Sequence, residues 1–142
     1  MIDRLKHETI KLENNITVHY LPDSDAGYGE ARVIVPFGHA YNTGDIPEGS
    51  FHFLEHMVLN RSKRYPEKDA FEKFVADNGG YINGGTGLNM TSYEISTPTD
   101  AFDESFKGLV SHVFEPIFIE EDLESHKQIV RNERIRSTPF YP

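Results

Sequence analysis

The chain has 142 residues, of which 37% are hydrophobic, and this length and composition suit one compact domain with a single core. It contains no cysteine, so disulfides, thiolate zinc sites and thiol nucleophiles are excluded, and any metal must be held by histidine and carboxylate side chains. The formal net charge of -9 argues against electrostatic capture of nucleic acid or of an anionic membrane surface.

No segment of the sequence predicts membrane insertion or secretion. No apolar run is long enough to span a bilayer, and residues 1–15 lack the apolar core of a signal peptide. We therefore expect a cytoplasmic protein whose partners include neither nucleic acid nor membrane.

The first half of the chain predicts a hairpin, a strand and a helix. Apolar and polar residues alternate over residues 9–22 on both sides of Glu13-Asn14-Asn15, which is typical of a β-hairpin. The apolar segment 31–38 predicts a strand, and segment 41–49, rich in Gly, Pro, Asn and Asp, predicts a loop. A helix is expected from about residue 49 to residue 59.

The second half predicts one more helix, two strands and two final helices. Pro66 and Glu67 are expected in the first turn of a helix that ends before Gly79-Gly80. Strands are expected at residues 81–87 and 90–97, and helices at about residues 100–114 and 120–136. This order predicts a two-layer α+β domain in which helices cover one face of a mostly antiparallel sheet.

The segment His52-Phe-Leu-Glu55-His56 places three polar groups in the first predicted helix. Because successive residues turn by about 100°, these side chains share an arc of about 100°. Two imidazoles one turn apart can bind one tetrahedral ion, and the carboxylate between them can act as general base on a metal-bound water. Alternatively, the histidines lie on the helix surface and Glu55 is a solvated partner.

The neighbours of these three groups favour the metal site. They are all apolar, namely Phe51, Phe53, Leu54, Met57, Val58 and Leu59. A helix with so little polar surface is expected to be buried, and buried histidines beside a carboxylate need a shared partner.

A catalytic zinc site with two histidines needs a third protein ligand. In the last predicted helix, His126 and Glu133 continue the apolar stripe that contains Leu123, so Glu133 is expected to face inward and is a candidate for that ligand. A buried carboxylate can instead form an ordinary ion pair. The possible partners of Glu133 are Arg32, Arg61 and Arg64.

Four spaced motifs match the pattern of one peptidase family. GSFHFLEHM (49–57) resembles G-x-x-H-F-L-E-H-M, and KRYP (63–66) resembles the basic-Tyr-Pro turn that follows it. GGYINGGT (79–86) with Thr91-x-Tyr93 resembles the G-G-x-x-N-A-x-T block and its T-x-Y strand. IVRNERIR (129–136) resembles the V-x-x-E segment, with Glu133 separated from His56 by 76 residues. From residue 16 to 137, the chain thus resembles the pitrilysin/insulinase family of zinc metallopeptidases, which includes the mitochondrial processing peptidases.

The resemblance implies a role for each matched residue. His52, His56 and Glu133 would bind Zn2+, and Glu55 would take a proton from the zinc-bound water that attacks a peptide carbonyl. The residues that would line the substrate cleft, where an extended peptide pairs with the strand edge, are Asn83, Gly84, Gly85 and Thr86. Judged without the resemblance, the same Gly-rich block could simply turn the chain.

The chain departs from the family pattern at two positions. Seven residues before the third ligand, where the family commonly has a second glutamate, the chain has His126. An imidazole there could hydrogen-bond a ligating carboxylate, or it could weaken catalysis. Gly84 stands where the family has alanine, a change that loosens the strand.

The length of the chain bears on its partners. Members of the family build a closed chamber from two or four related domains, and a later domain helps to bind the peptide substrate. We therefore expect residues 1–142 to be a single, incomplete domain of a metalloendopeptidase, completed by a second homologous domain or by another chain.

There are two alternatives to a zinc metallopeptidase. S-ribosylhomocysteine lyase uses the same H-x-x-E-H arrangement, but its third ligand is a cysteine, which this chain lacks. A non-catalytic, peptide-binding or structural subunit of the same family is the second alternative. His126 and the short chain favour that alternative, because a metal site needs supporting residues as well as ligands.

Overall fold

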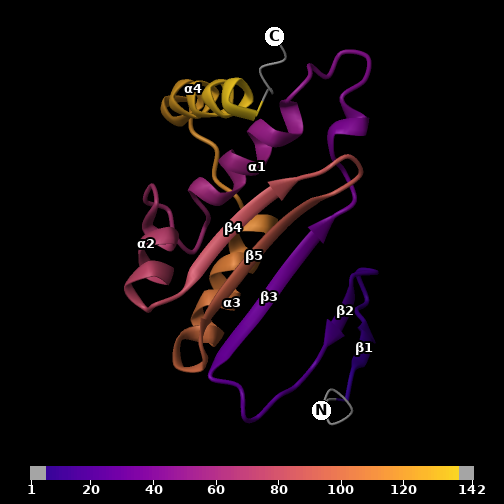
Figure 1. The fold of residues 1–142 in the computed structure, drawn as a ribbon, viewed down its shortest axis with the longest axis vertical. Helices are drawn as coiled ribbons and strands as arrows, with labels where there is room; N and C mark the ends of the chain where they lie inside the picture. Colours follow the sequence, from indigo (N-terminus) through magenta and orange to yellow (C-terminus); the bar gives the residue numbers. More distant parts are fainter. Residues whose placement is uncertain (1–5, 138–142) are drawn as a thin grey trace.

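A computed structural model describes residues 6–137, with side chains up to residue 133, as two antiparallel sheets and four α-helices (Figure 1). The elements are β1 (Glu8–Lys11), β2 (Thr17–Tyr20), β3 (Tyr28–Val35), the 3-10 helix η2 (His39–Tyr41), α1 (Ser50–Asn60), α2 (Ala70–Asp77), β4 (Tyr81–Thr86), β5 (Thr91–Pro98), α3 (Thr99–Phe114) and α4 (Glu120–Ser137).

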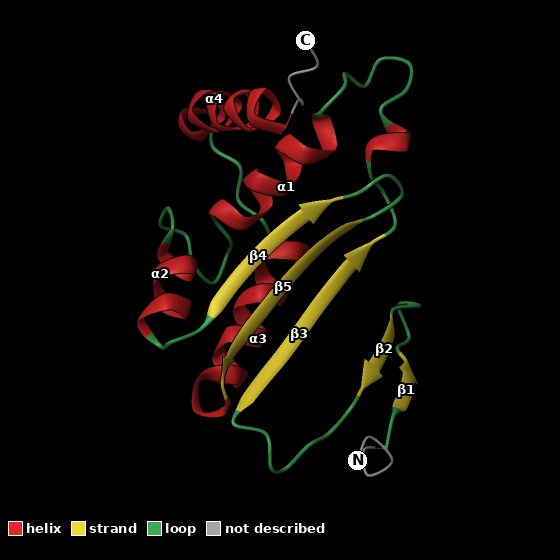
Figure 2. Cartoon of the chain, in the orientation of Figure 1, coloured by secondary structure: helices red, strands yellow, loops and turns green. Residues whose placement is uncertain are grey.

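The main sheet has the strand order β3-β5-β4, and both pairings are antiparallel. Tyr93 in the central strand lies opposite Val33 on one side and Gly84 on the other. Along β5, fully buried residues alternate with half-buried ones, because successive side chains point to opposite faces. Figure 2 shows α3 behind the sheet and no helix in front of it, which confirms the predicted α+β domain with one covered face.

The core lies between this covered face and the helices. Its fully buried members are Val58, Phe71, Val75, Tyr93, Ile95 and Leu109. Burial of each such side chain contributes roughly 1.5–3 kcal/mol to folding. The core therefore fixes α1 and α2 on the sheet as well as α3, and α1 carries the H-x-x-E-H segment.

Helix α1 begins where the sequence predicts, and the cause is local. Gly49 has φ 87°, a left-handed conformation that favours glycine, and the hydroxyl of Ser50 bonds to the carbonyl of Pro47 at 2.8 Å. The helix ends at Asn60, because Arg61 is extended. It is not buried all round: Leu54 is 43% exposed, while Met57 and Val58 are buried.

Three boundaries differ from the expectation by more than one residue. The turn at Pro66 and Glu67 does not belong to α2, because Asp69 has φ 57° and interrupts the helical path, so the helix starts at Ala70. Strand β3 starts earlier than residue 31 because its pairing with β5 begins at Tyr28. It ends at Val35, before Pro36, which lacks the N–H for a further ladder bond.

The N-terminal hairpin forms as predicted, but it forms a sheet of its own. Strands β1 and β2 pair with each other, and Figure 1 places them apart from β3. Of the helices between residues 6 and 137, none combines the length and the apolar character that crossing a membrane requires.

Candidate metal centre

Three donor atoms from two helices meet beside the sheet. Nε2 of His52 lies 3.2 Å from Nε2 of His56, one turn further along α1. Oε2 of Glu133, from α4, lies 3.1 Å from the first of these nitrogens and 3.2 Å from the second. Within residues 6–133, this is the only group of three histidine, cysteine or carboxylate side chains close enough to hold a metal ion together.

The spacing of these atoms matches a tetrahedral metal site. Donor atoms about 2.0 Å from a tetrahedral ion stand about 3.3 Å apart, close to the three distances seen here. All three side chains are partly buried. A cation between the three donor atoms could accept a lone pair from each of them, and this donor set of two imidazoles and one carboxylate suits zinc.

The three arginines expected as possible partners of Glu133 pair with other carboxylates. Arg32 pairs with Glu94 across the sheet. Arg61 pairs with Asp122 at 2.7 Å, and Arg64 pairs with Glu104 at 2.5 Å. Glu133 instead lies against the two histidines of α1.

Glu55 lies on the same helix but contacts the sheet. It is buried, at 5% exposure, and its Oε2 accepts a 2.8 Å hydrogen bond from the hydroxyl of Thr86 on β4. Its Oε1 lies only 2.5 Å from where a Cβ on Gly84 would stand, so the glycine makes room for the carboxylate. Burial, and secondarily the negative charge of Glu55, raise the pKa of Tyr93.

A cleft of about 580 Å³ surrounds these residues. One wall is β4, the edge strand of the main sheet, and the cleft is lined by all four residues from Asn83 to Thr86. Gly84 and Thr86 lie on the face toward α1, where they contact Glu55. The side chain of Asn83 donates to Glu94 at 3.4 Å, so its amide lies along the sheet beside β5.

His126 lies beside the cluster without being one of its three donors. The residue is buried, its ring centroid is 6.5 Å from that of His56, and it lines the cleft. Its Nδ1 bonds to the backbone carbonyl of Asp122 at 2.9 Å, so this nitrogen carries the proton. In the neutral ring, Nε2 then keeps its lone pair.

Sequence reasoning missed several residues of this region. His39 lines the cleft and packs edge-on against His52, with ring centroids 6.4 Å apart, but a single histidine outside the expected strands and helices gives no pattern to detect. Asp69 and Glu72 also line the cleft. The bond between Arg61 and Asp122 joins residues 61 positions apart, which no local periodicity indicates.

Comparison with known proteins places the chain in a family. Residues 20–138 match the family described as Insulinase (Peptidase family M16). The chain is 30% identical to "Insulin-degrading enzyme-like 1, peroxisomal" of Arabidopsis thaliana over 81% of its own length, and 26% identical to "Putative zinc protease mug138" of Schizosaccharomyces pombe over 96%. The crystal structure of pitrilysin superposes on 95% of the chain with a TM-score of 0.89 and 26% identity.

The matches cover only a small part of these larger proteins. The chain spans 12% of the Arabidopsis protein, 14% of the Schizosaccharomyces protein and 14% of the pitrilysin chain. Over that part, however, the family match includes the whole main sheet, α1 and α4. The chain therefore belongs to the insulinase family of peptidases, M16.

Proposed function

We propose that the chain carries the catalytic metal site of a zinc-dependent metalloendopeptidase, with His52, His56 and Glu133 as the protein ligands of the zinc. The observation that carries this proposal is the mutual spacing of their donor atoms, 3.1 to 3.2 Å. Membership of a peptidase family supports it, as does likeness to a relative whose name contains "zinc protease".

The contacts of each side chain indicate its proposed role in catalysis. A bound zinc ion would polarise a substrate carbonyl and lower the pKa of water to near 7. Glu55 is the proposed proton acceptor: the bond from Thr86 occupies its Oε2, while Oε1 lies over Gly84 at the wall of the cleft. A carboxylate held there can take a proton from the attacking water and pass it to the leaving amine.

The edge of β4 is the proposed binding surface for an extended peptide. In residues 6–137, β4 pairs with β5 on one side only, and its free side borders the cleft. A peptide can add to such an edge by main-chain hydrogen bonds, which would bring its backbone close to Glu55 and to the donor cluster. The residues of β4 proposed to contact it are Asn83, Gly84, Gly85 and Thr86.

The charge of the cleft favours basic segments as substrates. Among the described residues that line it there are four carboxylates, those of Glu55, Asp69, Glu72 and Glu133, and no lysine or arginine. One zinc ion would offset only two of these charges. Complementary charge raises the rate of encounter with a positively charged peptide.

A second wall must complete the cleft. The chain matches only 14% of the pitrilysin chain. Its donor cluster lies in an open cleft beside a sheet edge. We infer that a second homologous domain, or another chain, closes this cleft over the peptide.

A non-catalytic, peptide-binding subunit of the family is the second candidate. His126 is the observation that favours it, since the family commonly has a glutamate there, and its Nδ1 is bonded to the Asp122 carbonyl. Such a subunit would keep the fold and the peptide-binding edge without hydrolysis.

Metal analysis combined with peptide cleavage tests these proposals. We expect one zinc per chain by elemental analysis, and cleavage of a basic fluorogenic peptide that a chelator abolishes and added zinc restores. Because the cleft needs a second wall, cleavage is assayed with and without the candidate partner domain. Bound zinc without cleavage in either assay would favour the non-catalytic subunit, and absence of zinc binding would contradict the proposed site.

A further inference from the structure

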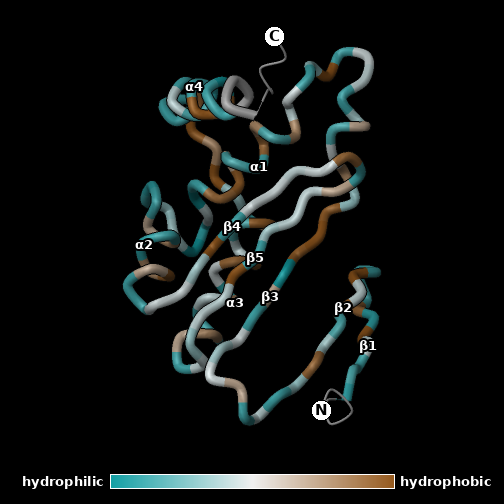
Figure 3. The backbone as a smooth tube through the Cα atoms, viewed as in Figure 1, coloured by the Kyte–Doolittle hydropathy of each residue, from teal (hydrophilic) through white to brown (hydrophobic). Residues whose placement is uncertain are grey.

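Helix α4 carries the proposed third ligand, yet few apolar side chains hold the helix in place. Of its side chains from residue 120 to 133, only Asp122 and His126 are buried, and both are polar. Most of the helix is coloured as hydrophilic in Figure 3. Hydrophobic packing, which normally fixes the rotation of a helix on its neighbour, is therefore weak here.

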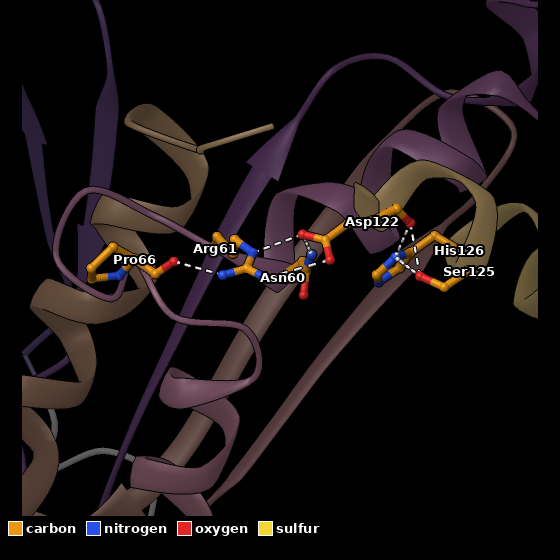
Figure 4. Close-up of polar contacts among 6 residues, drawn as sticks. All are labelled: Asn60, Arg61, Pro66, Asp122, Ser125 and His126. Carbon is orange, nitrogen blue, oxygen red and sulfur yellow. Dashed lines mark hydrogen bonds and ion pairs between the residues drawn. The ribbon is translucent and has the colours of Figure 1, made fainter. Parts of the chain in front are cut away.

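A buried polar cluster takes the place of that packing (Figure 4). The Asp122 carboxylate accepts hydrogen bonds of 2.7 Å from Nδ2 of Asn60 and 2.7 Å from Nε of Arg61. Asn60 is the last residue of α1, and Arg61 follows it. The other end of the Arg61 guanidinium donates to the carbonyl of Pro66 at 3.0 Å, which fixes its orientation.

Two further features show that this contact is built into the fold. The backbone N–H of Ile117 bonds to the carbonyl of Arg61 at 3.0 Å, which brings the start of α4 to the end of α1. The exposed fraction of Asp122 is only 3%. The hydrogen bonds from Arg61 hold the pKa of Asp122 below its ordinary value although burial opposes this, so the carboxylate is charged at neutral pH.

The geometry of α4 links this cluster to the metal ligand. Glu133 is 11 residues after Asp122, which is about three full turns, so the two side chains point to the same side of the helix. This face of α4 thus meets α1 at two places, which are about 16 Å apart along the axis of α4. Asp122 meets the end of α1, and Glu133 meets His52 in its first turn and His56 near its middle.

We propose that Asp122 is a positioning residue for the third metal ligand. By binding Asn60 and Arg61, its carboxylate sets the rotation and crossing angle of α4 on α1, and this brings the Glu133 carboxylate to the two histidines. Its backbone carbonyl also holds Nδ1 of His126. This inference rests on the proposed zinc site, and it adds a residue that does not itself touch the metal.

Zinc affinity measured across a double-mutant cycle tests the inference. The variants are Asp122→Asn, Glu133→Gln and the double variant, and zinc affinity is measured by competition with a chelating dye. Asp122→Asn should weaken zinc binding about 10-fold in the wild-type chain. If Asp122 acts through Glu133, the same change should weaken binding less than about 2-fold when Glu133 is already glutamine.

Matched variants separate positioning from general destabilisation. Glu124→Gln removes a carboxylate two residues away, in an exposed pair with Lys127, and should leave zinc affinity unchanged. Arg61→Lys keeps the charge but loses the planar fork, and should weaken zinc binding in the same direction as Asp122→Asn, by a smaller factor. Circular dichroism of the metal-free variants checks that each remains folded. If Asp122→Asn does not fold, Arg61→Lys takes its place in the double-mutant cycle.

The results of the double-mutant cycle distinguish failure of this inference from failure of the proposed zinc site. The inference is supported if Asp122→Asn lowers zinc affinity in the otherwise wild-type chain but not in the Glu133→Gln variant. An equal loss in both backgrounds, or no loss in the wild-type chain, would overturn it while leaving the proposed zinc site in place. A wild-type chain that binds no zinc would overturn the proposed site and the inference with it.

Discussion

The hydroxyl of Thr86 donates a 2.8 Å hydrogen bond to Oε2 of Glu55, and so joins the edge strand of the sheet to the helix that carries both histidines. Each of these residues is on an element that the core fixes in place: Glu55 on α1 and Thr86 on β4. The proposed general base is thus oriented by the same strand that would bind the peptide.

Replacing Thr86 by valine should slow hydrolysis without removing the metal. The variant keeps the shape of the side chain but loses the hydrogen bond, so Glu55 is free to rotate away from the attacking water. We expect kcat to fall about 10-fold and zinc content to stay at the wild-type level. Steady-state cleavage of a fluorogenic peptide, with zinc measured on the same sample, checks both expectations.

Thr97 on β5 provides the control for this change. Its hydroxyl is buried without a hydrogen-bond partner among the described residues. Thr97→Val should therefore raise stability, by about 1 kcal/mol, and leave kcat unchanged. Equal losses of kcat in both valine variants would show that Thr86 acts on the sheet rather than on Glu55.

Replacing Glu55 by glutamine should retain zinc and abolish hydrolysis. The amide can still accept the bond from Thr86, but it cannot take a proton from water. We expect the rate to fall by at least about 100-fold, because general base catalysis contributes about 100- to 10,000-fold. Elemental analysis and peptide cleavage on the same preparation measure the two effects, and loss of the metal would mean that Glu55 is a ligand.

Replacing Glu133 by glutamine should weaken zinc binding as well as the rate. The carboxylate contributes a donor atom 3.1 Å from one histidine nitrogen and 3.2 Å from the other, and an amide is a poorer ligand. Zinc affinity should fall by more than the roughly 10- to 100-fold that loss of a supporting residue costs. Undiminished affinity in a chelator competition would point to a different third ligand.

A buried histidine in the core should make the fold sensitive to mild acid. His112 is fully buried, stacks on Phe71 with ring centroids 4.6 Å apart, and has no partner at Nε2 among the described residues. Burial lowers its pKa below the ordinary value of 6.5. The unfolded chain therefore binds a proton first as the pH falls. The stability that comes from keeping His112 neutral is present above about pH 6.5 and is lost as the pH falls from there through the lowered pKa of the folded state.

His112→Phe should remove this pH dependence. The phenyl ring keeps the stacking on Phe71 and leaves no buried nitrogen unpaired, so the melting temperature should fall less between pH 7 and pH 5 than in the wild type. His19→Gln, on the exposed hairpin, is the control and should keep the wild-type slope. An unchanged slope in His112→Phe would assign the acid sensitivity to other groups.

Much of the fold could be predicted from the sequence, because the signals are local. Alternation of apolar residues gave both hairpin strands, and helical spacing gave α3 and α4 to within one residue. The boundary errors have local causes that periodicity does not contain, such as the left-handed conformation of Asp69. That helices cover one face of the sheet was predicted from the α+β pattern, whereas the separation of the β1–β2 hairpin from the main sheet was not.

The sequence by itself determined that His52, Glu55 and His56 share one side of a helix, because the geometry of an α-helix fixes the direction of residues three and four positions apart. Only the tertiary structure decided where Glu133 lies, since 76 residues separate it from His56 and no periodicity extends over that distance. Its place depends on how α4 docks on α1, and that docking rests on Asp122, Asn60 and Arg61. Contacts between such distant residues form only when the chain folds around its core.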